Sequence, residues 1–242
     1  MGCYSFYNED FKEHALIVYE CVKNDNRLPI IVRKFSSIIN VSDIEGLVND
    51  LILLTALLHD VGKVIKRYQD GDLKSFTHHD FVGALIMKEI IEYMNSRRCN
   101  LASIVNDDMR RIVESILITG PLFHLYLHRG KEESWRAYDI EEEIGKGGLE
   151  IPSECVRSIL DTLNSFKEQV SKEGKALMEC MAKAFESGKV NEYLKQYWRI
   201  DLHSIAKYYN EINNAKEYGW FFEGITAMIN ECDDEAARRR RG

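Results

Sequence analysis

An adjacent histidine and aspartate stand at the end of a strongly apolar run. The run Leu51–Leu58 leads directly into His59-Asp60-Val61-Gly62-Lys63. At the polar edge of a buried helix, an imidazole and a carboxylate together suit a divalent ion such as Mn²⁺, Fe²⁺, Co²⁺, Ni²⁺ or Zn²⁺. Lys63 follows His59 by about one helical turn, so its ammonium group can meet a phosphate oxygen on the same face. The pentapeptide therefore indicates metal-assisted chemistry on phosphate. By itself it also fits a helix that turns to solvent and stops at Gly62.

Further histidines and aspartates occur at helix positions from which they could converge on this pair. His14 falls within the apolar stripe of a predicted first helix, and His78-His79 stands where another helix is expected to begin. The backbone N–H groups of such a helix N-terminus favour an anionic phosphate. Asp233-Asp234 is expected to close the last helix, and His124 follows a break at Gly120-Pro121. Because a metal site needs several ligands, these residues form the candidate set.

Helices must position these residues, because the 242 residues include only 3 prolines and many strong helix formers. Apolar periodicity predicts a first helix over about residues 9–24 and a second over 30–39. A third, capped by Ser42-Asp43, reaches the His-Asp pair. Thr77-His78-His79-Asp80 has the spacing of a capping box and predicts a helix that runs through Met94.

The second half of the chain is predicted to continue in helices after one irregular stretch. A helix over residues 107–118 should end at Gly120-Pro121. Residues 129–152, rich in charge and glycine, are expected to form a mobile loop or a short hairpin. Helices resume at Ser153 and continue to near Cys232. Since the period-2 alternation of a sheet is rare throughout, we predict an all-α fold that forms a single domain over residues 1–242.

Composition limits the classes of function. The net charge of -7 argues against a domain that binds nucleic acid by itself, despite the arginines at 238–241. The chain either acts on small phosphorylated molecules or receives a polymer from a partner. The 6 scattered cysteines form no C-x-x-C pair and are expected to be reduced core residues. No membrane span or signal peptide is apparent, so we expect a soluble, cytoplasmic protein.

In their order along the chain, these residues resemble the HD superfamily of metal-dependent phosphohydrolases. Three segments look more narrowly like the CRISPR-associated HD nuclease of type I interference, whose motifs are HD-x-G-K, an F-x-H-E-x-x-S-A-like segment and a late D-x-x-A. The segments are His59–Lys63, Phe76–Ala84 and Cys232–Ala237. Since the chain has no helicase motif, it is similar to the stand-alone form, often archaeal, that is separate from its helicase.

The resemblance implies a role for each matching residue. The implied metal ligands are His14, His59, Asp60, His79, His124 and Asp233. Asp60 would bridge two ions and take part in catalysis. Lys63 would stabilise charge on the scissile phosphate, and His78 would touch phosphate. The implied cofactor is one or two divalent ions, with Mn, Ni, Co, Fe and Mg as candidates.

One stretch departs from the family pattern. The family usually has a His-His pair after an apolar helix, but this chain has Thr119-Gly120 there. His124, or else His128, is expected to substitute from beyond Pro121. If neither does, the second ion loses two ligands.

Three hypotheses follow from the resemblance. The leading one is a metal-dependent nuclease that cleaves single-stranded DNA in type I CRISPR interference. Its expected partners are a separate helicase subunit and a guide-RNA surveillance complex. The alternatives are an HD enzyme that hydrolyses nucleotides or cyclic nucleotides, which the acidic composition favours, and a non-catalytic subunit with a degraded site.

Overall fold

A computed structural model describes most of the chain. The described residues are 2–7, 9–39, 44–71, 73, 76–96, 99, 107–123, 149–196, 198, 201, 204–205 and 219–239. His124 and His128 lie outside them. So does most of the stretch 129–152 that is predicted to be a loop or hairpin.

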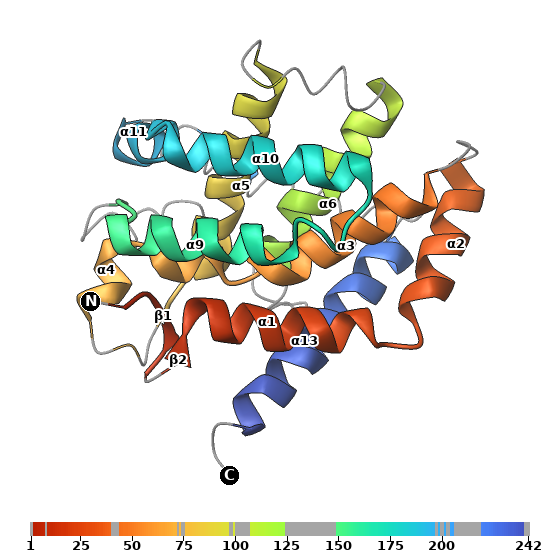
Figure 1. The fold of residues 1–242 in the computed structure, drawn as a ribbon, viewed down its shortest axis with the longest axis horizontal. Coiled ribbons are helices and arrows are strands. Elements are labelled where there is room, and N and C mark those ends of the chain that lie inside the picture. Colours follow the sequence, from red (N-terminus) through yellow and green to blue (C-terminus); the bar gives the residue numbers. More distant parts are fainter. Residues whose placement is uncertain are drawn as a thin grey trace.

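Helices make up nearly all the regular structure of these residues, which confirms the predicted all-α fold (Figure 1). The helices are α1 (Phe11–Lys23), α2 (Leu28–Ile39), α3 (Glu45–Leu58), η1 (Val61–Val64), α4 (Lys66–Gln69), α5 (His79–Asn95), α6 (Asp107–Phe123), α9 (Ser153–Phe166), α10 (Lys172–Glu186), α11 (Lys189–Gln196) and α13 (Gly219–Arg239). A short antiparallel hairpin, β1 (Tyr4–Phe6) and β2 (Glu9–Asp10), precedes α1.

Helix α3 lies in the interior of the molecule and carries the His-Asp pair at its end. Eleven of its 14 residues are buried, because its sequence is apolar around nearly the whole circumference. It packs against α1, α2 and α6, while η1 packs against α5. Helices α1, α9 and α10 lie side by side, and α13 crosses α1 (Figure 1). The first and last helices are therefore neighbours, although they are far apart in the sequence.

Three predicted helix boundaries are wrong. Helix α5 has His78 as its N-cap, with a left-handed φ of 61° and no side-chain cap hydrogen bond, so the predicted capping box does not open it. Helix α6 continues through Pro121 to Phe123 instead of ending at Gly120-Pro121. Helix α13 continues to Arg239, so Asp233 lies inside the last helix and does not close it.

Gly120, inside α6, lies at a close contact with α3. A Cβ atom at Gly120 would lie 1.8 Å from Thr55 Cγ2. Thr119 beside it is buried, with 2% of its surface exposed. The Thr119-Gly120 stretch therefore supports the helix that carries the His-Asp pair.

Gly62 has a similar function at the contact between η1 and α5. A Cβ atom there would lie 1.7 Å from the backbone oxygen of His79 and 2.6 Å from the backbone nitrogen of Gly83. Both obstacles are backbone atoms, which cannot move aside as a flexible side chain can. Glycine at this position thus allows His59-Asp60 and His79 to approach one another.

Gly62→Ala is therefore expected to destabilise the protein by about 3 kcal/mol, the upper range for overpacking. Urea denaturation followed by circular dichroism would measure this loss. Gly46→Ala is the matched control, since no heavy atom lies within 4 Å of a Cβ built there. Alanine in this exposed helical position should be neutral or stabilise by up to about 1 kcal/mol. Equal free energies of unfolding for the two variants would contradict the packing argument.

The six cysteines form three disulfides, which corrects the expectation that they are reduced. The bonds join Cys3 to Cys155, Cys21 to Cys232, and Cys99 to Cys180. The partners are 152, 211 and 81 residues apart in the sequence. No local spacing can reveal such pairs, because only the packing of distant helices brings them together. None of the described helices has both the length and the apolarity that crossing a membrane requires.

Candidate metal centre

Four side chains from distant parts of the sequence meet beside the end of α3. They are His14 from α1, His59 and Asp60 from the end of α3, and Asp233 from α13. Each offers one ligand atom, and these atoms all lie within 4.8 Å of one another. The first three side chains are at most 1% exposed, whereas that of Asp233 is 23% exposed. The four side chains thus lie in the interior of the protein, and the carboxylate of Asp233 is the one that is partly exposed to solvent.

The separations within the group fit those of ligands around one metal ion. His14 Nε2 lies 3.2 Å from Asp60 Oδ2, 3.1 Å from Asp233 Oδ1 and 3.4 Å from His59 Nε2. With metal–ligand bonds of about 2.1 Å, adjacent donors lie about 3.0 Å apart in an octahedron and about 3.4 Å apart in a tetrahedron. His59 Nε2 is somewhat farther from the carboxylates, at 3.6 Å from Asp60 Oδ2 and 4.0 Å from Asp233 Oδ1. A divalent transition metal therefore fits these four residues.

The orientation of the histidine rings points to the same use. His59 Nδ1 lies 2.7 Å from the carbonyl oxygen of Ala56, and His79 Nδ1 lies 2.6 Å from that of Phe76. A carbonyl oxygen can only accept, so Nδ1 carries the proton in each ring. Nε2 of each ring is thereby directed toward Asp60, where it could bind a cation. Metal-bound histidines usually donate their other ring N–H in this way.

Asp60 presents its two carboxylate oxygens to two different groups. Oδ2 faces His14 and also lies 2.6 Å from Lys63 Nζ, whereas Oδ1 lies 3.3 Å from His79 Nε2. His79 lies outside the four-residue group but shares Asp60 with it. This arrangement suits a carboxylate that bridges two ions, with His79 on the second.

The pKa of His14 shows that the group stabilises positive charge. Burial lowers this pKa, but hydrogen bonds to three carboxylates outweigh burial and raise it to about 10. The three acceptors, from the largest effect, are Asp233, Asp60 and Glu9. Burial also raises the pKa of Asp233, but the hydrogen bond from His14 lowers it well below its usual range. In the metal-free protein a proton on His14 thus occupies the place where a cation would bind.

Uptake of a divalent ion at pH 7.5 is consequently expected to release about one proton per ion, because a ligand nitrogen must be deprotonated. Because the pKa of His14 is about 10, the ring keeps its proton at lower pH. The affinity for the ion should therefore rise as the pH increases toward about 10 and level off above it. Calorimetry of Mn²⁺ binding in two buffers with different ionisation enthalpies would count the released protons. His14→Gln should release none. A wild-type affinity that is constant between pH 7 and 9 would contradict the prediction.

Lys63 and His78, the residues expected to contact phosphate, lie close to the centre. The Lys63 side chain is 12% exposed, and its ammonium lies 5.3 Å from the ring centre of Phe76. His78 is 8% exposed, and its ring makes an edge contact with Phe81. Neither side chain belongs to the group that can hold a metal.

Thr119 and His124 are the two positions that bear on the ligands expected for a second ion. His124 lies outside the described residues. Thr119 occurs where the family's His-His pair is expected, but its neighbour Gly120 packs on α3. Within the described part of the chain, His79 is the further histidine that lies against Asp60, at 3.3 Å from Oδ1.

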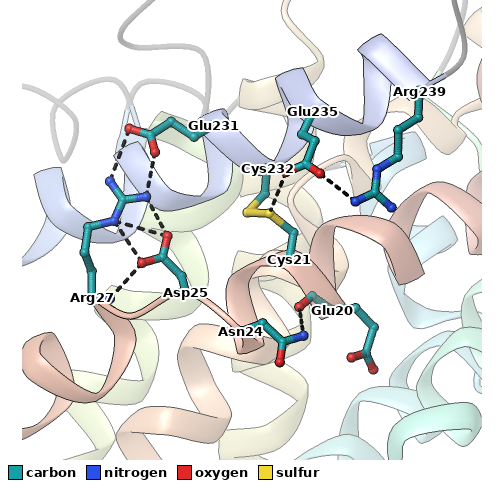
Figure 2. Close-up of a disulfide and its surroundings, with 9 residues drawn as sticks. All are labelled: Glu20, Cys21, Asn24, Asp25, Arg27, Glu231, Cys232, Glu235 and Arg239. Carbon is teal, nitrogen blue, oxygen red and sulfur yellow. Dashed lines mark hydrogen bonds and ion pairs between the residues drawn. A yellow bond between two sulfur atoms is a disulfide. The ribbon is translucent and has the colours of Figure 1, made fainter. Parts of the chain in front are cut away.

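Asp233 reaches the centre because α13 is fixed to α1 beside it. Figure 2 shows the disulfide between Cys21 of α1 and Cys232 of α13, the residue directly before this ligand. Nearby, the Arg27 guanidinium lies between Asp25 and Glu231, at 3.1 and 2.6 Å from the two oxygens of Glu231. This ion pair is exposed and adds little stability, whereas the disulfide links the two helices covalently next to Asp233.

Sequence reasoning missed one residue beside the centre. Glu9 Oε1 lies 3.2 Å from His14 Nδ1, on the side of the ring away from the other donors. The sequence prediction places Glu9 inside the first helix, whereas it belongs to β2. A carboxylate five residues before a histidine gives no recognisable motif, so only the fold reveals this contact.

Comparison with known proteins gave one match. Residues 13–144, more than half of the chain, match the family model described as HD domain. No curated protein and no solved structure matches the chain.

Proposed function

The chain belongs to the HD domain family, and we propose that it is a metal-dependent nuclease that cleaves single-stranded DNA. Family membership indicates a metal-dependent phosphohydrolase. The observation that carries the proposal is the convergence of His14, His59, Asp60 and Asp233. Single-stranded DNA as the substrate rests on the resemblance of three sequence motifs to the nuclease of type I CRISPR interference.

The residues around the centre have distinct parts in the proposed hydrolysis. A divalent ion bound there would lower the pKa of a water molecule and polarise a phosphoryl oxygen. Asp60 lies between the two sets of donors and fixes their relative positions. The partly exposed Lys63 ammonium can turn from Asp60 to the scissile phosphate and offset the charge that develops there. His78, at the start of α5, is proposed to hold a phosphate oxygen of the same substrate.

The proposed ions follow from the donor types. Imidazole and carboxylate suit Mn²⁺, Ni²⁺, Co²⁺ or Fe²⁺, with Mg²⁺ as a further candidate. His14, His59, Asp60 and Asp233 would hold the first ion. A second ion would have Asp60 and His79 as ligands, and its binding would be weaker because it has fewer described donors.

A nucleic-acid substrate requires partners that deliver it. The net charge of -7 opposes unaided binding of a polyanion. We propose that a separate helicase subunit and a guide-RNA surveillance complex bring the displaced strand to the centre. The proposed location is the cytoplasm. Most cytosolic proteins lack disulfides, but the intracellular proteins of hyperthermophiles are often rich in them. The three disulfides of this protein are compatible with a cytoplasmic location in that second class.

Two alternatives each have an observation in their favour. Hydrolysis of nucleotides or cyclic nucleotides is favoured by the acidic composition, since a small substrate needs no basic groove. A non-catalytic subunit is favoured by Thr119-Gly120, where Gly120 packs against Thr55 and the family's His-His pair is missing.

Cleavage assays with defined ions would distinguish these functions. Protein stripped with EDTA would be incubated with labelled single-stranded DNA, duplex DNA and a panel of linear and cyclic nucleotides, with Mn²⁺, Ni²⁺, Co²⁺ or Mg²⁺. We expect cleavage of single-stranded DNA that depends on the added ion. Hydrolysis confined to nucleotides would support the first alternative, and metal binding without any hydrolysis would support the second.

A further inference from the structure

We propose that Glu9 is a positioning residue of the metal centre, which holds the His14 ring so that Nε2 faces the ion. Its carboxylate lies 3.2 Å from His14 Nδ1. Glu9 is only 5% exposed, although it belongs to a short hairpin near the start of the chain. This inference rests on the metal centre of the proposed function and does not depend on the identity of the substrate.

A buried carboxylate is costly unless its oxygens have partners. Glu9 Oε1 faces the His14 ring, and Oε2 accepts a hydrogen bond of 3.1 Å from the Ser5 hydroxyl. Ser5 belongs to β1 and Glu9 to β2, so the hairpin itself orients the carboxylate. The hydrogen bond from Ser5 to Oε2 thus directs the other oxygen, Oε1, toward His14 Nδ1.

His14 needs such an external acceptor, whereas the other two histidines do not. His59 and His79 lie at helix ends, and each Nδ1 reaches the carbonyl three residues earlier. His14 lies inside α1, where the backbone carbonyls accept helical hydrogen bonds. The carboxylate of Glu9 takes the place of that carbonyl. A carboxylate behind a ligand histidine also makes the ring a stronger donor to a cation than a backbone carbonyl would.

The hairpin is held against the helices by contacts that do not involve the metal donors. Cys3, directly before β1, is bonded to Cys155 of α9, and its carbonyl accepts from the backbone N–H of Phe11 at 2.8 Å. Asp10 follows Glu9 and caps α1 by accepting from the backbone N–H of Lys12. Glu9 and Asp10 thus support α1 in two separable ways, one through the His14 ring and one through the helix backbone.

Binding of Mn²⁺ to the stripped full-length protein, measured by electron paramagnetic resonance, would test the proposal. Glu9→Ala is expected to weaken Mn²⁺ affinity about 10–100-fold, the usual effect of removing the acceptor behind a ligand histidine. Glu9→Gln keeps an oxygen that can accept from Nδ1 but lacks the charge. It should therefore recover most of the affinity and bind within about tenfold of wild type.

Asp10→Ala is the matched control, since it removes the neighbouring carboxylate and weakens α1 itself. It should lower the thermal unfolding midpoint by about 3 °C and leave Mn²⁺ affinity unchanged. Circular dichroism would establish that each variant is folded before binding is measured. If Glu9→Ala does not fold, the comparison of Glu9→Gln with Asp10→Ala decides, because only Glu9→Gln should bind Mn²⁺ measurably more weakly than wild type, by up to about tenfold.

Each negative result would overturn a different part of the proposals. Wild-type protein that takes up no Mn²⁺ would overturn the metal centre and the role of Glu9 with it. Wild-type protein that binds Mn²⁺ but does not cleave DNA would overturn only the proposed substrate. Equal affinities for wild type, Glu9→Ala and Glu9→Gln would overturn the positioning role alone. So would an equal loss in Glu9→Ala and Asp10→Ala, because it would show a general effect of loosening α1.

Discussion

Asp60→Asn is expected to reduce the proposed metal-dependent cleavage of single-stranded DNA at least about 1000-fold, a loss of about 4 kcal/mol of transition-state stabilisation. Asparagine keeps the shape of the side chain but loses its charge, and one oxygen becomes an amide group that cannot bind a cation. Both oxygens of Asp60 are used, at 3.2 Å from His14 Nε2 and 3.3 Å from His79 Nε2. The substitution therefore affects every donor around the centre.

Initial rates with saturating Mn²⁺ and a separate measurement of Mn²⁺ affinity would show whether binding or turnover is lost. Asp201→Asn is the matched control. Asp201 is also a carboxylate in an ion pair, 3.0 Å from Lys88 Nζ, but it does not belong to the metal centre. Its rate should stay within about twofold of wild type. A rate for Asp60→Asn within tenfold of wild type would refute the assignment of this carboxylate.

Removal of the disulfide between α1 and α13 is expected to have the largest effect on stability. Cys21→Ala/Cys232→Ala opens a loop that spans 211 residues of sequence. On the loop-entropy estimate, this raises the entropy of the unfolded chain enough to cost about 5 kcal/mol. Guanidinium denaturation under non-reducing conditions would measure the loss as a lower transition midpoint.

Cys99→Ala/Cys180→Ala is the control, since its loop spans only 81 residues and should cost less. Thiol titration of the unfolded, unreduced wild-type protein should detect no free cysteine, in keeping with six paired cysteines. Detection of two free thiols together with an unchanged midpoint in Cys21→Ala/Cys232→Ala would show that this bond does not form.

The parts of the fold that the sequence predicts well are those set by local pattern. The run Leu51–Leu58 is apolar on every side, which predicts a buried helix, and α3 is that helix. The polar pair directly after it, His59-Asp60, lies buried at the end of this helix. The predicted range 9–24 likewise approximates α1, because the apolar stripe around His14 is periodic.

The parts of the fold and of the metal centre that the sequence does not predict depend on long-range packing. The meeting of His14 with Asp233 requires α13 to lie across α1, and no local signal encodes that contact. A proline such as Pro121 usually ends a helix, yet α6 continues through it to Phe123, and Gly120 beside it packs closely on α3. The contact of Glu9 with His14 was missed for a similar reason, since it depends on the pairing of two short strands.

The order of the ligands along the chain has a consequence for synthesis. His14 precedes Asp233 by most of the described chain, yet the two lie 3.1 Å apart in the folded protein. A nascent chain whose α13 is still inside the ribosome has three of the four donors and lacks the fourth. The four-donor centre should therefore form only after α13 has been made and has packed across α1.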